Sequence, residues 1–277
     1  MLAKTYGCSI FGVQASLITI ETQVGQGSKC HLVGLPDSTI KEAILRVESS
    51  IKQMGCFFPR RKVIINLAPA NVRKEGSAYD LPIALSVIQA SEQVHMPALD
   101  QFVIMGELAL DGILRPIKGA LPIALEARKN GIQKIILPKS NAHEAAFVEG
   151  ISVFGMESLS ETVQFLRGKT IHRAITMENP FNPKPKSSLD FDQVQGQLMA
   201  KRAFEIAAAG AHNLLLIGPP GAGKTMLAKR FPSILPPLLL EEAMETTIVH
   251  SIAGKIPDQH ALLSQRPYRA PHHSISS

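Results

Sequence analysis

The feature that most constrains the fold of this chain is the stretch GPPGAGKT at residues 218–225. It has the spacing G-x-x-x-x-G-K-[ST], the apolar run LLLI at residues 214–217 precedes it, and an amphipathic segment follows it. This order predicts a short buried strand, a glycine-rich loop and a helix that begins at Lys224. The alternative, a glycine-proline turn that precedes a helix by chance, is weaker because strand and helix patterns stand where the motif requires them.

Such a loop can bind phosphate groups because glycine has no Cβ, so successive N–H groups can point at phosphate oxygens near a helix start. Lys224 is predicted to reach the β- and γ-phosphates of a nucleotide, and the Thr225 hydroxyl is predicted to ligate its Mg²⁺. The sequence therefore predicts nucleotide binding. The predicted phosphate-binding residues are Gly218, Pro219, Pro220, Gly221, Ala222, Gly223, Lys224 and Thr225.

The composition is that of an ordinary globular protein, with 277 residues of which 45% are hydrophobic and 19% charged. No apolar run approaches the roughly 18 residues of a membrane span, and the N-terminus lacks the continuous apolar segment of a signal peptide. Cys8, Cys30 and Cys56 lie far apart without C-x-x-C spacing, so neither a disulfide framework nor a zinc site is expected. We therefore expect a cytoplasmic protein with no membrane partner.

The formal net charge of +6 would suit a nucleic-acid partner. The excess is divided evenly between residues 1–170 and 171–277, so charge alone is weak evidence. Basic clusters occur at residues 60–62, 73–74, 201–202 and 229–230, and a solvated surface is the alternative interpretation of each. With no Trp and 5% aromatic residues, the composition does not predict a platform on which single-stranded bases stack.

Patterns of strands and helices alternate over residues 1–167 and predict one compact mixed α/β domain. Asp80 is expected to cap a helix, and Asp111-Gly112 predicts a hairpin between strands at residues 102–110 and 113–116. The other strands are expected at residues 6–11, 14–22, 31–33, 62–67, 134–137 and 151–154.

The composition of the sequence changes after residue 167. Residues 168–190 contain Pro180, Pro183 and Pro185 among polar residues without apolar periodicity, which predicts a linker. Residues 191–277, which include the glycine-rich loop, are expected to form the first part of a second α/β domain.

Four stretches of this chain, at residues 33–51, 65–85, 196–230 and 266–276, are distinctive. They resemble the YifB/ComM-type magnesium-chelatase-like AAA+ ATPases of bacteria. The resemblance implies ATP and Mg²⁺ as cofactors, and it places the adenine against Val194, Gln195 and Gly196. It also implies a homo-oligomeric, hexameric ring and a DNA-acting motor for branch migration or recombination in natural transformation. A motor that inserts a metal or remodels a protein is the alternative.

In that family the first domain resembles the ribosomal S5 domain 2-like proteolytic domain of Lon-type proteases, which use a Ser-Lys dyad. The similar segments here place Ala78 at the nucleophile position and Leu121 at the lysine position. Neither side chain can perform that chemistry. Ser77 and Lys118 lie nearby but out of register, so the resemblance implies a non-catalytic scaffold or DNA-contacting module, with a peptidase as the lower alternative.

Members of the family also have a Walker B acidic pair, a sensor residue and an arginine finger, and none of these can be identified in the 277 residues. Glu241-Glu242 follows an apolar run but comes too soon after Lys224 for a crossover to return to a sheet, so it is expected to begin a helix. We therefore expect the N-terminal half of a longer protein, whether by truncation, frameshift or design, that binds nucleotide poorly and hydrolyses little of it. His250 and His272-His273 are expected to have packing roles, with a metal site as the alternative.

Overall fold

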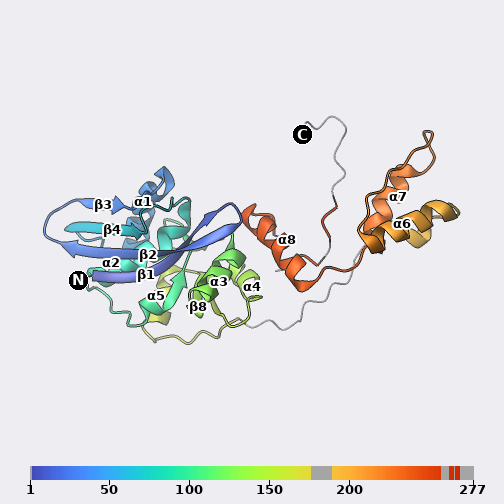
Figure 1. Ribbon diagram of the computed structural model, residues 1–277. Helices are drawn as coiled ribbons and strands as arrows, with labels where there is room; N and C mark the ends of the chain where they lie inside the picture. The colour runs from blue at the N-terminus through green and yellow to red at the C-terminus, as the bar shows by residue number, and fades with distance from the viewer. Residues whose placement is uncertain (1, 176–188, 257–261, 265, 269–277) are drawn as a thin grey trace. The chain divides into compact units, whose positions relative to one another are not determined.

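The computed structural model describes residues 2–175, 189–256, 262–264 and 266–268. The chain divides into two compact units (Figure 1). Unit 1 comprises Met1–Glu178 with Thr247–Ala261, and unit 2 comprises Asn179–Thr246 with Leu262–Ser277. No helix among the described residues is long and apolar enough to cross a membrane.

Unit 1 is built on a seven-stranded sheet with the strand order β3-β4-β2-β1-β5-β8-β9. The β1–β2 and β2–β4 pairs are antiparallel and the other four pairs are parallel. This mixed sheet, with helices packed on it, confirms the mixed α/β class predicted for the first domain. The strands are β1 (Leu2–Phe11), β2 (Gln14–Gly25), β3 (Cys30–Val33), β4 (Lys62–Ala68), β5 (Phe102–Ile104), β8 (Lys134–Pro138) and β9 (Ser152–Met156).

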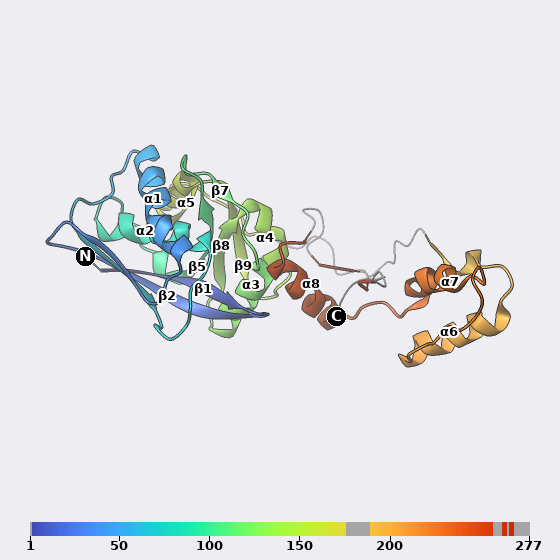
Figure 2. The same cartoon turned by 90° about the horizontal axis from the view of Figure 1, so that it is seen from above.

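The hydrophobic centre of unit 1 is α2 (Asp80–Ala90), in which every residue is buried. It packs between α1 (Ser38–Gln53) and the β1–β2 hairpin (Figure 2). A hydrogen bond of 2.7 Å between the hydroxyls of Thr22 and Ser86 ties α2 to β2. The remaining helices of this unit are α3 (Ala120–Lys129), α4 (Lys139–Ala145) and α5 (Leu159–Leu166), with short 3-10 turns η1 (Ser77–Tyr79) and η2 (Leu99–Gln101).

The prediction that Asp80 caps this helix is wrong. Tyr79 is the N-cap residue, and Asp80 is the first helical residue. The Asp80 carboxylate instead accepts hydrogen bonds from Arg46, 34 residues earlier, because that cation and not the helix end neutralises it. By contrast, Asp37 does cap α1, since its Oδ1 accepts a hydrogen bond of 2.8 Å from the Ile40 N–H.

The segment predicted as one strand at residues 102–110 is divided into two. β5 joins the main sheet, whereas β6 (Glu107–Leu108) pairs with β7 (Leu114–Arg115) in a separate two-stranded hairpin. The division lies at Gly106, whose N–H donates a hydrogen bond of 2.8 Å to the Ala78 carbonyl. The predicted hairpin turn at Asp111-Gly112 is confirmed, with Gly112 at φ 86°.

Unit 2 is helical in its described residues and has its own small core. The core consists of Phe191, Val194, Phe204 and Leu227, with Leu216 and Phe231 packed against it. Its elements are η3 (Phe191–Gln193), α6 (Leu198–Gly210), α7 (Lys224–Arg230) and η4 (Phe231–Ile234).

The buried strand predicted at residues 214–217 is absent from the structure. Leu215 and Ile217 are 82% and 88% exposed, and only Leu216 packs inward. The physical reason is that a strand needs a neighbouring strand to satisfy its N–H and C=O groups, and the described part of unit 2 contains no other strand.

Helix α8 (Leu240–Ile252) begins with Glu241 and Glu242 in its first turn. This confirms the prediction that the acidic pair begins a helix. The C-terminal half of α8 belongs to unit 1, where Ser251 donates a hydrogen bond to the Glu144 carboxylate.

Candidate functional site

The predicted phosphate-binding loop folds as a turn that leads directly into α7. Gly221 and Gly223 both have φ of 80°, a left-handed conformation that glycine adopts without strain. Gly223 is the N-cap residue of α7, and its carbonyl accepts a hydrogen bond of 3.0 Å from the Leu227 N–H. The helix therefore begins at Lys224, as the sequence predicts.

The ammonium group of Lys224 lies against the loop that precedes it. Its Nζ donates hydrogen bonds to the carbonyls of Gly218 and Pro219, at 2.8 and 2.7 Å. Both partners are neutral, so nothing among these contacts neutralises the lysine charge. A phosphate group could replace these carbonyls as the partner of the ammonium, and the exposed Thr225 hydroxyl at the next position could ligate a metal held by that phosphate.

The segment predicted to face the adenine lies beside the same loop. The Val194 side chain is 1% exposed and belongs to the core of unit 2, so only its main chain could face a ligand. Gly196 has φ of 69° and open space where a Cβ would stand. Gln197 donates a hydrogen bond of 3.1 Å from its Nε2 to the Ala222 carbonyl, which brings this segment and the loop together.

Gln197 and Arg230 were missed by the sequence-based prediction. Arg230, at the end of α7, donates a hydrogen bond of 3.1 Å to the Gln193 side chain. These two contacts join the segment at residues 193–197 to the loop and to α7. Gln197 and Arg230 contact Ala222 and Gln193, which are 25 and 37 residues away in sequence, so no local pattern indicated either contact.

No group of three metal-ligating side chains occurs within the described ranges of the chain. His250 lies in the last turn of α8, and His272 and His273 lie outside the described residues.

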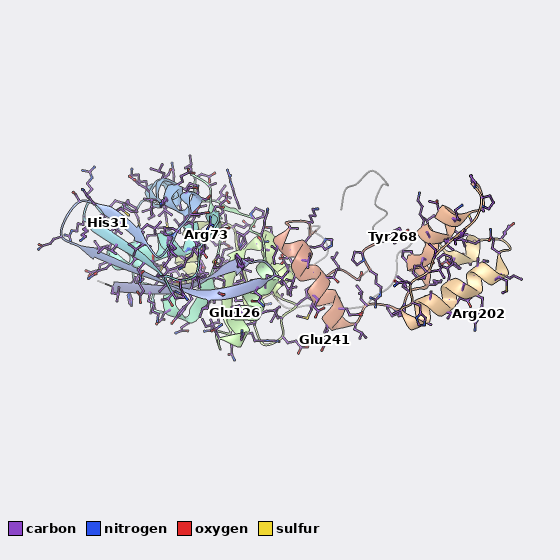
Figure 3. The ribbon with its side chains drawn as sticks, turned by 45° about the horizontal axis from the view of Figure 1, so that its top comes forward. His31, Arg73, Glu126, Arg202, Glu241 and Tyr268 are labelled. Atoms are coloured by element: carbon purple, nitrogen blue, oxygen red, sulfur yellow. The ribbon has the colours of Figure 1, made fainter. Side chains whose placement is uncertain are left out.

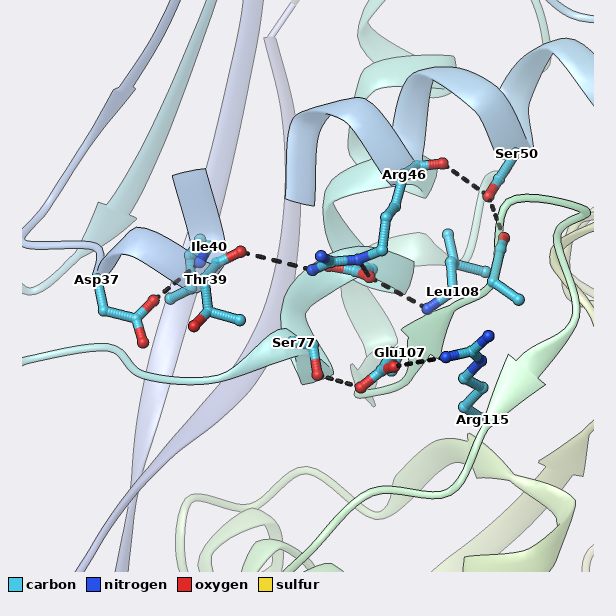
Figure 4. Close-up of polar contacts among 11 residues, drawn as sticks. Asp37, Thr39, Ile40, Arg46, Ser50, Ser77, Glu107, Leu108 and Arg115 are labelled. Carbon is cyan, nitrogen blue, oxygen red and sulfur yellow. Dashed lines mark hydrogen bonds and ion pairs between the residues drawn. The ribbon is translucent and has the colours of Figure 1, made fainter. Parts of the chain in front are cut away.

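The positions predicted to correspond to the Lon-type dyad, Ala78 and Leu121, carry no reactive pair. Ala78 lies in η1, and Leu121 is fully buried in α3, where its N–H donates a hydrogen bond of 2.8 Å to Glu144. The nearby Ser77 hydroxyl donates a hydrogen bond to the Glu107 carboxylate, which also faces Arg115 at 3.7 Å (Figure 4). The partner of this serine is thus a carboxylate rather than a lysine.

A buried ion pair beside these residues was not predicted. Asp80 is 0% exposed and accepts hydrogen bonds from Arg46 and from the Leu108 N–H (Figure 4). Burial raises the pKa of Asp80 above its ordinary value, while the hydrogen bond and charge of Arg46 lower it. The one available signal was a single carboxylate at the head of an uncharged run at residues 81–91.

Comparison with known families covers both units. Residues 20–141 match the family described as subunit ChlI of Mg-chelatase, and residues 190–277 match the family described as magnesium chelatase, subunit ChlI. Known relatives of the same kind extend over nearly the whole chain. The chain is 43% identical over 279 residues to the competence protein ComM of Haemophilus influenzae, and 44% identical over 267 residues to the YifB protein of Escherichia coli.

The chain belongs to the ComM/YifB-type magnesium-chelatase-like proteins. The two alignments include 99% and 96% of this chain but 54% and 52% of the relatives, so the chain spans about half the length of the curated relatives it matches. An archaeal Lon protease of Thermococcus kodakarensis is 25% identical over 174 residues, which covers 59% of this chain and 27% of that protein. This similarity confirms the expected resemblance of the chain to Lon-type proteases.

Proposed function

We propose that residues 191–277 are the nucleotide-binding part of a magnesium-chelatase-like AAA+ motor, with ATP and Mg²⁺ as cofactors. The observation that carries this proposal is the fold of residues 218–225, with Lys224 against the Gly218 and Pro219 carbonyls at the start of α7. ATP would supply the phosphates that replace those carbonyls, and Thr225 would ligate the accompanying Mg²⁺. The main chain at Val194 and Gly196 would hold the adenine.

The proposal includes the organisation of the chain. Residues 1–167 act as a Lon-like scaffold without dyad chemistry, residues 168–190 act as a linker, and residues 191–277 carry the nucleotide. The proposed assembly is a hexameric homo-oligomer in the cytoplasm. Hydrolysis requires a carboxylate that orients water, and the described Glu241-Glu242 pair begins α8 instead of ending a strand. We therefore assign nucleotide binding, and not hydrolysis, to these residues.

Nucleotide binding by the 277-residue chain tests the site. Fluorescence of an ATP analogue should report binding by the wild-type chain and by Lys229→Ala, which removes an exposed lysine from the same helix. Lys224→Ala should abolish binding while its circular dichroism spectrum is unchanged. Unchanged affinity in Lys224→Ala would contradict the assignment.

The proposed substrate of the motor is DNA, with metal insertion or protein remodelling as the second candidate. A net charge of +6 supports DNA, because cations that release counterions from phosphates provide most of the affinity for nucleic acids. The protein should retard branched DNA in a gel, more strongly at low salt. Absence of any retardation at low salt would favour the second candidate.

A further inference from the structure

Unit 1 has an open groove of about 660 Å³ where the α1–β4 loop meets the ends of β2 and α2. The loop contributes Phe57, Phe58, Arg60 and Arg61, and Glu92 lies two residues beyond the end of α2. The size is within the range of small-ligand sites, about 300 to 1,000 Å³. The predicted nucleotide site does not involve these residues.

An aromatic ring is presented to solvent at this groove by a fixed backbone. Phe57 is 62% exposed, although both of its main-chain groups are held by one side chain. Its N–H donates a hydrogen bond of 2.9 Å to Gln93 Oε1, and its carbonyl accepts one of 2.8 Å from Gln93 Nε2. Gln93 is itself fixed by a contact of 2.6 Å with the Ser91 hydroxyl. The exposure of Phe57 therefore belongs to an ordered loop.

The two arginines of the groove lack partners in the part of the chain that the structure describes. Arg60 and Arg61 are exposed, and neither has a hydrogen bond or ion pair there. Arg73 and Arg202, which belong to two other basic clusters and are labelled in Figure 3, are paired with Glu75 and Glu205 at 2.7 and 3.0 Å. The arginines at 60 and 61 are thus available to an anion. Glu92, which also lines the groove, carries the opposite charge.

We propose that this groove binds single-stranded nucleic acid, with Phe57 stacking on a base and Arg60 and Arg61 contacting the flanking phosphates. An exposed aromatic ring beside unpaired arginines fits this ligand, because a base has a π-face and its backbone has anionic oxygens. The composition did not predict such a surface, since a count of aromatic residues does not show where a single ring lies. The assignment rests on the proposed DNA partner for its biological setting, whereas its residues are separate from the phosphate-binding loop.

The test is fluorescence anisotropy of the 277-residue chain with labelled oligomers of about 20 nucleotides, in separate deoxythymidine and uridine arms that distinguish DNA from RNA. Phe57→Ala should weaken binding about fivefold or more, from the loss of one stacked base. Phe57→Leu should also weaken binding and keeps apolar bulk in the loop. Arg60→Ala/Arg61→Ala should lower the slope of log affinity against log salt by about 1.4, measured between about 50 and 200 mM.

Two controls match these changes in unit 1. Phe11→Ala removes a ring that is 85% exposed at the opposite end of the β1–β2 hairpin, and Arg128→Ala/Lys129→Ala removes two basic charges from the end of α3. Both should bind like the wild-type chain. Equal losses in the controls, or equal displacement of the oligomer by polyglutamate and by unlabelled oligomer, would overturn the groove assignment.

The remaining outcomes separate this proposal from the nucleotide site. Lys224→Ala should lose the ATP analogue and keep the oligomer, which supports two distinct sites. A wild-type chain that binds the analogue but no oligomer at about 50 mM salt would overturn the groove and leave the phosphate-binding loop intact. Retention of full oligomer affinity in all groove variants would also overturn the groove, even if the DNA partner itself is correct.

Discussion

Asp80, the first residue of α2, accepts two hydrogen bonds from Arg46 of α1, from Nε at 2.7 Å and from Nη2 at 3.0 Å. The carboxylate is fully buried, whereas the arginine side chain is 23% exposed. Because Asp80 Oδ2 also accepts the Leu108 N–H at 3.2 Å, this bidentate pair joins α1, α2 and β6. The pair lies beside η1, which contains Ala78, the predicted equivalent of the Lon-type nucleophile.

Removal of Arg46 should destabilise the chain substantially. Arg46→Ala would leave a buried carboxylate without its cation, which costs about 3 kcal/mol of unfolding free energy. Lys52→Ala is the control, because its ion pair with Glu48 is exposed and contributes about 0.5 kcal/mol or less. Urea unfolding measures both. If Arg46→Ala loses no more unfolding free energy than Lys52→Ala, the Arg46–Asp80 pair does not stabilise the fold.

The cost of Arg46→Ala should depend on pH. Burial raises the pKa of Asp80 above its ordinary 3.8, and loss of Arg46 would raise it further. A carboxyl group with a raised native pKa binds its proton more tightly in the folded state, so stability falls as pH rises through that pKa. The difference in unfolding free energy between variant and wild type should therefore be smaller at pH about 5 than at about 7.5. Equal differences at the two pH values would argue against an ionised Asp80.

Glu144 should impose a similar pH dependence on the docking of α8 within unit 1. The carboxyl group accepts hydrogen bonds from the Leu121 N–H and the Ser251 hydroxyl, and burial raises its pKa above the ordinary 4.5. Its stabilising effect is therefore lost as pH rises through the native pKa. Glu144→Gln should have a melting temperature that changes less between pH about 5 and 7.5 than that of the wild type.

The exposed Glu149→Gln is the matched control for this change. Its melting temperature should follow the wild-type pH dependence. If Glu144→Gln and Glu149→Gln behave alike, the buried carboxyl group has no role in that dependence.

The strands of unit 1 could be predicted because their signal is local. β2 and β4 alternate buried and less buried side chains over seven residues, and this pattern needs no knowledge of the partner strand. The start of α7 was also predicted, since glycine spacing and helix periodicity are adjacent in sequence. Asp80 was misread because its partner lies 34 residues away, and a carboxylate at a helix start looks the same whether it caps the helix or pairs with an arginine.

The left-handed glycine before α7 should be essential for nucleotide binding. A Cβ at Gly223 would meet only ordinary contacts, at 3.5 Å from Met226 and 3.6 Å from Gln197, so the constraint is its φ of 80°. Valine in this conformation costs about 1 to 2 kcal/mol or more, and Gly223→Val should lower the affinity for ATP about tenfold. Gly168→Val introduces similar strain at φ 71° in open space outside the loop, and it should bind ATP normally. Equal losses in both variants would point to general destabilisation.

In the apolar run at residues 214–217, which precedes the loop, neighbouring side chains have opposite surroundings. Leu215 and Ile217 are 82% and 88% exposed, whereas Leu216 packs on the core of unit 2. Leu215→Ser/Ile217→Ser should change the unfolding free energy of the 277-residue chain by only about 0.5 kcal/mol and should reduce its self-association in ultracentrifugation. Leu216→Ser should instead cost about 1 to 3 kcal/mol, since it removes a packed side chain. If the double variant is destabilised as strongly as Leu216→Ser, residues 214–217 form the buried strand that the sequence predicted, and a partner strand must lie outside the described residues.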